Sequence, residues 1–449
     1  MGWKAWDNSY LLYYPEDTEK RSWPDLLTVS SFVLSISQSF RMEGLSSVQI
    51  SSPNSLINIQ GATNYWSGGI IRGKGRVSVT SSLIANGQYK SLQDAVVLYL
   101  SPAATLSVME GNISMANGAS IEIDGTLKID SSTASNRVYI GQSQLLGISN
   151  QLLSANPEYK SVLSIYPARH WNGYFDNSIP LSEASGWYVN PECHPNCLVQ
   201  PKIYLKNNGR AICDDHSNVT FIAPIEFGGA TKLTIGKSAF TELASGGLCG
   251  NGVEVDIGDQ TLMQLSGGNF LMAKACTIKG LGELTSTAGE HTLAQSIQAH
   301  ITIEGGTLLW PLENGIGATI RFLGGLLIKN TGSLQLQPWS TNIVVDKLVQ
   351  FQDQCLVQFP VIGTAAQPYV SDSDAPDLSP RGTLTAVDSM VFLGGTLQGK
   401  ADFIADKIME LDGGVKNIRN LAKLINRGLA RLQLIIYNNI TFICKLIII

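Results

Sequence analysis

The stretch "YWSGGIIRGKGRVSVTSS", Tyr65–Ser82, joins closely spaced glycines to the alternating pattern of a β-strand. From Gly68 it reads glycine, four residues, Gly73 and Lys74, which is the start of a phosphate-binding loop pattern. Such a loop requires Ser or Thr after the lysine, and a helix beyond it to receive the phosphate. Position 75 is glycine instead, and "RVSVTSS" alternates apolar and polar residues. The stretch therefore predicts a tight turn between strands and argues against a nucleotide site.

A second copy of this pattern lies 326 residues further along the chain. Residues 66–106 align with residues 392–432 without a gap, and the identities fall on glycines, lysines and apolar positions. The identical pairs are Gly68 with Gly394, Gly69 with Gly395, Gly73 with Gly399, Lys74 with Lys400, Gly87 with Gly413, Lys90 with Lys416, Leu98 with Leu424, Ala104 with Ala430, and Leu106 with Leu432. A recurring unit of strand, turn and strand is typical of a solenoid, whose repeats bury their apolar faces against one another.

The composition indicates a β-rich chain. Its 449 residues are 44% apolar and only 15% charged, and they include 44 glycines. Typical proteins have about 25% charged residues, so this low charge argues against disorder and against a basic nucleic-acid-binding protein. Short alternating runs such as "ASIEIDGTLKID" recur, and helical periodicity is almost absent between Gly44 and Gly414. The sequence therefore predicts an all-β fold.

One set of residues follows the order Trp–Ser–Gly–Gly, Gly–x–Gly, Lys–x–Leu, and Gly–x–Ile followed by Gly–Ala. These residues are Trp66, Ser67, Gly68, Gly69, Gly73, Gly75, Lys90, Leu92, Gly111, Ile113, Gly118 and Ala119. With these motifs the chain resembles repeat-containing secreted or cell-surface proteins with a right-handed parallel β-helix, the pectin-lyase-like solenoid. The resemblance covers residues 48–131 and 228–432. It implies roughly a dozen coils of about 20–25 residues each, in proteins that serve as adhesins or stalks and, less often, as polysaccharide-cleaving enzymes.

Five regions follow from this pattern. Residues 1–46 form an N-terminal flank or cap, residues 47–150 form β-helix coils, residues 151–220 form an irregular insertion, residues 221–432 form further coils, and residues 433–449 form an atypical tail. Residues 415–432 also allow a basic amphipathic helix that would bind a membrane surface or a partner. The gap-free alignment favours strands there instead. The tail lacks the turn that its repeat position predicts, which suggests that the chain is part of a longer protein.

The insertion at residues 151–220 is rich in aromatic residues and prolines. Loops of a solenoid are less constrained than its coils and therefore often carry ligand contacts. If a ligand binds here, we expect a glycan stacked on exposed rings, and the candidate contacts are His170, Trp171, Tyr174, Trp187 and Tyr188. The alternative is that these aromatic side chains pack against the solenoid wall.

The cysteines of this region allow three interpretations. Cys193, Cys197, Cys213 and Cys249 are candidates for two disulfides that fix the insertion to the coils, and the resemblance to secreted proteins favours this pairing. Cys193, Cys197, Cys213 and His216 also have a spacing suited to a structural zinc ion. The third interpretation is that the thiols are unpaired. No other metal site and no cofactor is expected.

Targeting signals are sparse in the chain as given. The first residues show no basic and apolar signal peptide, and no uncharged apolar run reaches the roughly 18 residues of a membrane span. Asn112 and Asn218 begin glycosylation sequons, which would be used only in a secreted protein. From the resemblance we expect an extracellular or cell-surface location.

No catalytic residue is assigned from the sequence. The pair Asp214–Asp215 is the nearest approach to a glycosidase dyad, but adjacent carboxylates more often lie in a solvated turn. The expected function is therefore a non-enzymatic surface solenoid that acts as a structural spacer or adhesin. Its expected partners are glycans, contacted through the insertion, or other surface proteins, and neither a nucleic acid nor a cofactor is expected. The alternative is a polysaccharide-degrading lyase or hydrolase of the same fold.

Overall fold

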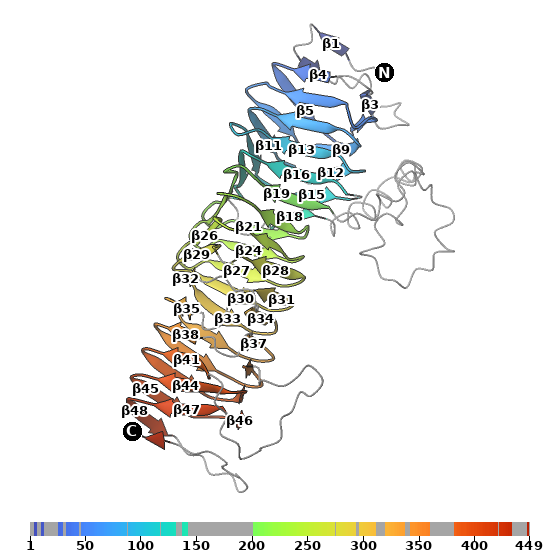
Figure 1. Cartoon of the computed structure of the whole chain (residues 1–449). Coiled ribbons are helices and arrows are strands. Elements are labelled where there is room, and N and C mark those ends of the chain that lie inside the picture. The colour runs from blue at the N-terminus through green and yellow to red at the C-terminus, as the bar shows by residue number, and fades with distance from the viewer. Residues whose placement is uncertain are drawn as a thin grey trace, which may run out of the picture. The chain divides into compact units, whose positions relative to one another are not determined.

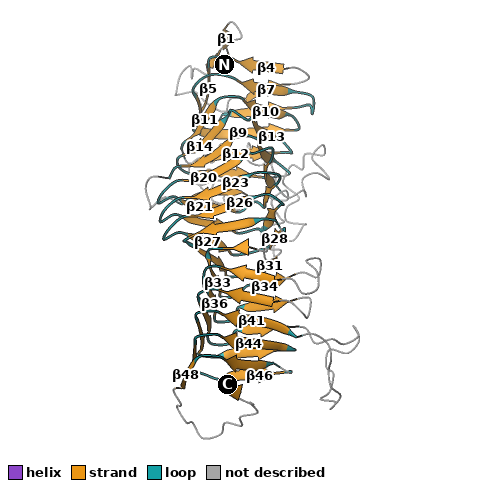
Figure 2. Ribbon diagram, turned by 60° about the vertical axis from the view of Figure 1, so that its left-hand side comes forward, coloured by secondary structure: helices purple, strands orange, loops and turns teal. Residues whose placement is uncertain are grey.

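The protein is described from a computed structural model. The described residues are 4–6, 10–12, 26–29, 33–44, 46–87, 89–116, 118–131, 137–141, 201–273, 275–292, 296–310, 319–336, 342–359, 381–420, 422–432 and 447–448. They divide into two compact units, residues 1–245 and residues 246–449. Figures 1 and 2 show that the secondary structure of these described residues is entirely β-strand, joined by turns.

Unit 1 contains three parallel sheets in which each strand pairs with the strand three positions later in the chain. Sheet 1a contains β3 (Leu26–Val29), β6 (Ser47–Ile50), β9 (Gly68–Gly73), β12 (Tyr89–Gln93), β15 (Asn112–Met115), β18 (Val138–Gly141), β21 (Asn218–Phe221) and β24 (Phe240–Leu243). Sheet 1b contains β4 (Val33–Ile36), β7 (Leu56–Ile59), β10 (Arg76–Val79), β13 (Val97–Leu100), β16 (Ser120–Ile123), β19 (Lys202–Leu205) and β22 (Ile225–Phe227). Sheet 1c contains β5 (Ser39–Met42), β8 (Asn64–Trp66), β11 (Ser82–Ala85), β14 (Thr105–Val108), β17 (Thr126–Ile129), β20 (Arg210–Cys213) and β23 (Lys232–Ile235).

Unit 2 repeats this arrangement. Sheet 2a contains β27 (Leu262–Leu265), β30 (Glu283–Ser286), β33 (His300–Ile303), β36 (Leu326–Ile328), β39 (Leu348–Phe351), β42 (Ser389–Phe392), β45 (Ile408–Leu411) and β48 (Leu429–Leu432). Sheet 2b contains β25 (Gly247–Cys249), β28 (Asn269–Met272), β31 (Glu290–Thr292), β34 (Thr307–Trp310), β37 (Ser333–Leu336), β40 (Leu356–Gln358), β43 (Gly395–Gln398) and β46 (Lys416–Arg419). Sheet 2c contains β26 (Glu254–Ile257), β29 (Thr277–Gly280), β32 (Ser296–Ile297), β35 (Thr319–Phe322), β38 (Asn342–Val345), β41 (Gly382–Ala386), β44 (Ala401–Ala405), β47 (Lys423–Asn426) and β49 (Ile447–Ile448).

These strands form a parallel β-solenoid of about 13 turns, which confirms the predicted all-β solenoid class. Each turn supplies one strand to each of three sheets, so ladder hydrogen bonds join residues of successive turns. In sheet 1b, for example, Val77 pairs with Leu98, Leu98 with Ile121, and Ile121 with Ile203. All four side chains are at most 2% exposed. Burying each such side chain contributes roughly 1.5–3 kcal/mol, so stacked apolar columns supply the core.

The stretch Tyr65–Ser82 shows how the turns approach one another. Gly68–Gly73 is strand β9, Arg76–Val79 is strand β10, and only a two-residue turn separates them. Gly73 has a φ of 116°, and a Cβ atom at this position would lie 2.0 Å from the carbonyl oxygen of Ile50 in the preceding turn. Glycine is therefore required by both backbone conformation and space. A strand, and not a helix, follows the glycines, so the stretch cannot receive a phosphate on a helix N-terminus.

The repeated copy has the same local geometry. Gly399 has a φ of 99°, and a Cβ atom there would lie 1.8 Å from the carbonyl oxygen of Phe359. Gly87 and its counterpart Gly413 also share a positive φ, at 80° and 77°. Among the identities that align the two segments, these glycines are thus positions at which the backbone of a solenoid turn demands glycine.

The solenoid extends beyond the boundaries expected from the sequence. Strands β3 to β5 already pair in parallel with β6 to β8, although residues 1–46 were expected to be a flank. Strands β19 to β21 stack on β16 to β18, although the insertion was expected to reach residue 220. Alternating apolar positions within "KIYL" and "RAIC" explain this, because they continue the buried columns. The expected insertion is thus too long at its C-terminal end.

Near the ends of the described residues, the N-terminal strands depart from the regular pattern, whereas the strands at residues 416–432 follow it. At the N-terminal side, β1 (Lys4–Trp6) pairs antiparallel with β2 (Tyr10–Leu12), and β2 pairs with β5. An antiparallel pair at this edge ends the parallel ladder, as caps of solenoids do. Residues 416–432 form β46, β47 and β48, so the alternative of an amphipathic helix there is wrong. Among the described residues, no helix has the length and apolarity needed to cross a membrane.

Candidate functional site on the outer face of sheet 1b

The predicted glycan contacts cannot be placed. His170, Trp171, Tyr174, Trp187 and Tyr188 lie outside the described residues, as do Cys193 and Cys197. Their proposed roles stay predictions.

The described cysteines give a different disulfide from the one expected. Cys249 is bonded to Cys276, with 5.9 Å between their Cα atoms, and both side chains are fully buried. Cys249 was expected to pair with a cysteine of the insertion, and this pairing is corrected. The spacing misled the prediction because partners in a solenoid are set by stacking, which places residues one turn apart side by side. Cys213 and Cys355 are free and buried, and burial raises the pKa of the Cys213 thiol to about 12.

Two members of the zinc alternative lie within the described residues, and they differ in burial. The Cys213 side chain points into the core and is 1% exposed, whereas His216 lies exposed on the turn that follows β20. Within the described part of the chain, no group of three potential ligands comes together.

The two glycosylation candidates start strands of sheet 1a. Asn112 and Asn218 are each half-buried, and the Asn112 Oδ1 atom accepts a hydrogen bond from the backbone N–H of Tyr139 at 3.3 Å. The Asn218 backbone N–H donates to Ser131 Oγ at 3.0 Å. Both asparagines thus lie within the ladder, and their modification stays a prediction.

The carboxylate pair also has structural contacts. Asp214 forms an ion pair with Lys128 at 2.7 Å, and Asp215 Oδ1 accepts a hydrogen bond from the backbone N–H of Lys237 at 2.7 Å. Each carboxylate therefore joins its own turn to a neighbouring one. This arrangement matches the interpretation of Asp214–Asp215 as a turn.

The repeated lysine lies inside the solenoid. Lys90 points to the same side of β12 as the buried Leu92, and its Nζ atom donates to the carbonyl oxygens of Gly87, Asn86 and Glu110. These three acceptors match the three N–H donors of an ammonium group. Burial lowers the pKa of Lys90 to about 8.

The counterpart of this lysine in unit 2 also donates to carbonyl oxygens of its own turn, and it shares with Lys90 the contact to the glycine three residues earlier. Lys416 Nζ donates to the carbonyl oxygens of Gly413 at 3.3 Å and Gly414 at 3.0 Å. The motif glycine–x–x–lysine thus describes a corner in which the lysine satisfies the carbonyl groups of its own turn. It is a structural motif at both positions.

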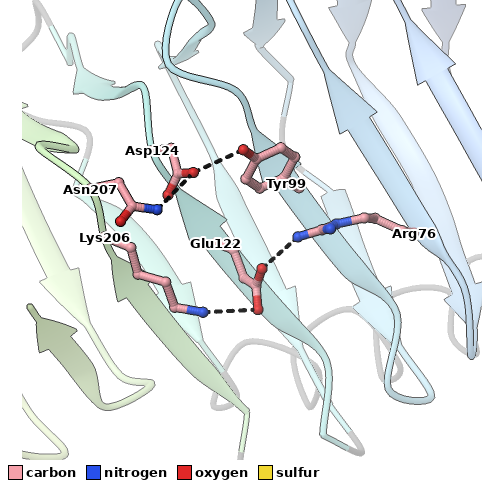
Figure 3. Close-up of polar contacts among 6 residues, drawn as sticks. All are labelled: Arg76, Tyr99, Glu122, Asp124, Lys206 and Asn207. Carbon is pink, nitrogen blue, oxygen red and sulfur yellow. Dashed lines mark hydrogen bonds and ion pairs between the residues drawn. The ribbon is translucent and has the colours of Figure 1, made fainter.

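A group of mutually bonded polar side chains lies on the outer face of sheet 1b. Its central column joins Tyr99, Glu122, Tyr204 and Glu226, which are paired in register on successive strands. These positions alternate with the buried apolar ones, so they face away from the core. Figure 3 shows six members of the group lying side by side over neighbouring strands. They are Arg76, Tyr99, Glu122, Asp124, Lys206 and Asn207.

Glu122 joins three turns of the solenoid. Its Oε2 atom pairs with Arg76 Nη2 at 2.6 Å, and its Oε1 atom pairs with Lys206 Nζ at 3.2 Å. The three residues belong to β10, β16 and the turn after β19. The Glu122 side chain is 22% exposed, while the Arg76 and Lys206 side chains are 42% and 45% exposed. The carboxylate is therefore held below two cations that reach further into solvent.

Asp124 organises the neighbouring half of the group. Its Oδ2 atom accepts hydrogen bonds from Tyr99 OH at 2.8 Å and from Asn207 Nδ2 at 3.2 Å. Burial, followed by the hydrogen bond to Asp124, raises the pKa of Tyr99. The phenol is therefore a hydrogen-bond donor at neutral pH, which fixes the orientation of the carboxylate.

The two tyrosine rings support the cations. The Arg76 guanidinium carbon lies 4.2 Å from the centroid of the Tyr99 ring, and Lys206 Nζ lies 4.9 Å from that of Tyr204. Lys202 Nζ pairs with Glu226 Oε1 at 2.9 Å. Contacts of this kind stabilise cations over aromatic faces by roughly 0.5–1 kcal/mol at exposed sites. The group is thus a rigid outer surface whose side chains hold one another in place.

Sequence reasoning did not find this surface. The alternation in "RVSV", "VLYL", "SIEI" and "KIYL" does indicate outward positions for Tyr99, Glu122 and Tyr204. Their contact depends on the stacking of β16 on β19, however, and Ser120 and Lys202 of that pair are 82 residues apart in the chain. No local pattern reports a register across such a distance.

No protein-family model, no curated protein and no solved structure matches this chain.

Proposed function

We propose that the chain is a non-catalytic solenoid of an extracellular or cell-surface protein, which acts as a structural spacer or adhesin. The observation that carries this proposal is the pairing of charges on the outer face of sheet 1b. Its carboxylates, Glu122, Asp124 and Glu226, each have a cationic or neutral donor within the chain. Groups that are already engaged in this way suit a binding surface better than a reaction centre.

The disulfide between Cys249 and Cys276 supports the proposed location. Disulfides persist in oxidising compartments and are rare in the cytosol, where thiols are kept reduced. Membership of the right-handed, pectin-lyase-like class is part of the same proposal and rests on the sequence motifs alone. Antibody labelling of intact and permeabilised cells tests the location. Labelling of permeabilised cells without labelling of intact cells would refute it.

A polysaccharide-degrading activity is the second candidate, and one observation favours it. Arg76, Glu122 and Lys206 come from three different turns and converge within 2.6–3.2 Å contacts. Convergent charges on successive turns are what a solenoid enzyme requires. The purified chain should be incubated with neutral and acidic polysaccharides while new reducing ends and unsaturated products are measured. We expect no turnover; turnover that Glu122→Gln abolishes would establish the enzyme instead.

A further inference from the structure

We propose that the outer face of sheet 1b binds a neutral glycan at the group formed by Arg76, Tyr99, Glu122, Asp124, Lys206 and Asn207. This inference rests on the proposed adhesive function and deepens it, because it assigns a site on the coils and a ligand class.

The side chains of this group are held in fixed positions by their contacts with one another. Tyr99 OH and Asn207 Nδ2 fix Asp124, while Arg76 and Lys206 fix Glu122 from opposite sides. All of these residues stand on or directly beside strands of one sheet, whose backbone is held by ladder hydrogen bonds (Figure 3). Binding to side chains that are already ordered costs less conformational entropy. The group is therefore prepared for a ligand before the ligand arrives.

These contacts leave several hydrogen-bond donors and acceptors of the group available. Both hydrogen bonds to Asp124 end on Oδ2, so Oδ1 is an unused acceptor, and Asn207 keeps its Oδ1 acceptor. Arg76 uses Nη2 toward Glu122 and retains the N–H groups of Nη1, while Lys206 retains N–H groups beyond its pair. Donors and acceptors thus lie next to each other on one exposed surface. A sugar hydroxyl, which donates and accepts at once, matches this mixture.

The positive and negative charges of the group balance. Arg76 and Lys206 carry two positive charges, and Glu122 and Asp124 carry two negative charges. The adjacent Lys202–Glu226 pair is also balanced. With no excess charge, the surface has no long-range attraction for an acidic ligand. Neutral hydroxyl groups are therefore a better match than uronates or sulfates.

The two tyrosines define how the ligand lies. Tyr99 and Tyr204 occupy one column and are separated by the strand of Glu122, so they are about 10 Å apart at roughly 4.8 Å per strand. Arg76 lies over the Tyr99 ring, and Lys206 lies over the Tyr204 ring. Because those cations cover part of each ring, the glycan would contact the polar groups that lie along the column. A linear glycan that crosses successive strands fits this arrangement.

The test measures binding of the whole chain to neutral oligosaccharides derived from cellulose, mannan and galactan, with polygalacturonate as the acidic comparison. The double variant Asp124→Ala/Asn207→Ala removes both unused acceptors, and we expect it to weaken binding at least tenfold. Tyr99→Phe keeps the ring but removes the hydroxyl that orients Asp124, and it should have a smaller effect in the same direction. Binding of the parent should change little with salt concentration, because no net charge is involved.

A matched control is available in unit 2. Arg321 and Asp346 form an ion pair at 3.1 Å on β35 and the turn after β38, without an aromatic residue in the pair. The double variant Arg321→Ala/Asp346→Ala should bind as the parent does. Thermal unfolding of each variant shows whether the fold is retained, and Tyr99→Phe provides a second readout should the alanine variant unfold.

Three results would overturn the inference. They are an absence of parent binding to every neutral oligosaccharide, equal binding by Asp124→Ala/Asn207→Ala and the parent, and binding to polygalacturonate alone that disappears at high salt. Any of these would leave the proposed function standing if the protein is labelled on intact cells. Absence of surface labelling together with site-dependent neutral binding would have the opposite meaning: the site would hold and the location would fail.

Discussion

Lys90 shows that a single residue can be polar, interior and structural at the same time. It faces the core of unit 1, yet its three donors meet three backbone carbonyl oxygens. The sequence marked this lysine through its repetition at Lys416, but it gave no sign of the side to which the side chain points. A lysine between alternating residues is expected to face solvent, so its burial could not be predicted from the pattern.

The first prediction concerns this contact. Lys90→Met keeps the length of the side chain and leaves the carbonyl groups of Gly87, Asn86 and Glu110 without their donor. Loss of a donor to buried acceptors costs about 1–3 kcal/mol, so the free energy of unfolding should fall by that amount in denaturant titrations. Lys416→Met is the control at the more open corner and should cost less. An equal loss in both variants would contradict the interior role of Lys90.

The second prediction concerns His291, which is fully buried in β31 of unit 2. Its Nδ1 atom accepts a hydrogen bond from the backbone N–H of Phe270 at 3.1 Å, and its Nε2–H donates to the carbonyl oxygen of Ala288 at 2.8 Å. Both nitrogens are therefore used by the neutral ring. Burial lowers the pKa of His291, so the folded protein binds this proton less readily than the unfolded chain does.

Because of His291, the free energy of unfolding should decrease as the pH falls below the pKa of an unfolded histidine. Above the unfolded histidine pKa of about 6.5 the ring is neutral in both states and has no effect. As the pH falls below that value, the unfolded chain gains a proton that the folded chain does not, and the free energy of unfolding decreases by up to about 1.4 kcal/mol per pH unit for one group. Thermal unfolding between about pH 7.5 and about pH 5 measures this slope. His291→Gln should reduce it, and His216→Gln, at an exposed turn, should not.

At the scale of elements, the glycines mark the places where one turn lies directly against the next. Their positions and the period-2 alternation were sufficient to predict short strands, among them the strand that follows Gly75 and the strands at residues 416–432. The alternation could not show which strand stacks on which, because every strand has the same period. The C-terminal end of the insertion and the partner of Cys249 depend on that stacking, and the structure differs from the prediction at both.

The third prediction tests this role of glycine by comparing two residues of unit 1. Gly73 and Gly229 both have a positive φ, 116° and 65°, but a Cβ atom at Gly229 would meet nothing within 4 Å. Gly229→Ala should therefore cost only the conformational strain, about 1 kcal/mol. Gly73→Ala adds a clash with the carbonyl oxygen of Ile50 and should cost more than about 3 kcal/mol. Denaturant unfolding distinguishes the two, and similar losses would show that close approach is not the reason for glycine.

At the scale of the whole molecule, the described chain consists of two units built in the same way, and stability in such a structure is local. In a solenoid each turn contacts only its neighbours, so a cross-link strengthens the turns that it joins. The disulfide of Cys249 and Cys276 lies within unit 2 and closes a sequence separation of 27 residues. Closing a loop of this length stabilises a folded protein by about 3–4 kcal/mol in the chain-entropy model.

The fourth prediction follows from that placement. In the variant Cys249→Ala/Cys276→Ala, the free energy of opening of β25 to β29 should fall by about 3 kcal/mol or more, so their backbone amides should exchange faster. The exchange rates of β6 to β16 in unit 1 should not change. Cys355→Ala removes a buried free thiol from unit 2 and controls for the loss of sulfur packing, so its effect should be smaller. Faster exchange in both units to the same extent would contradict local stabilisation, because it would mean that the two units unfold as one cooperative body.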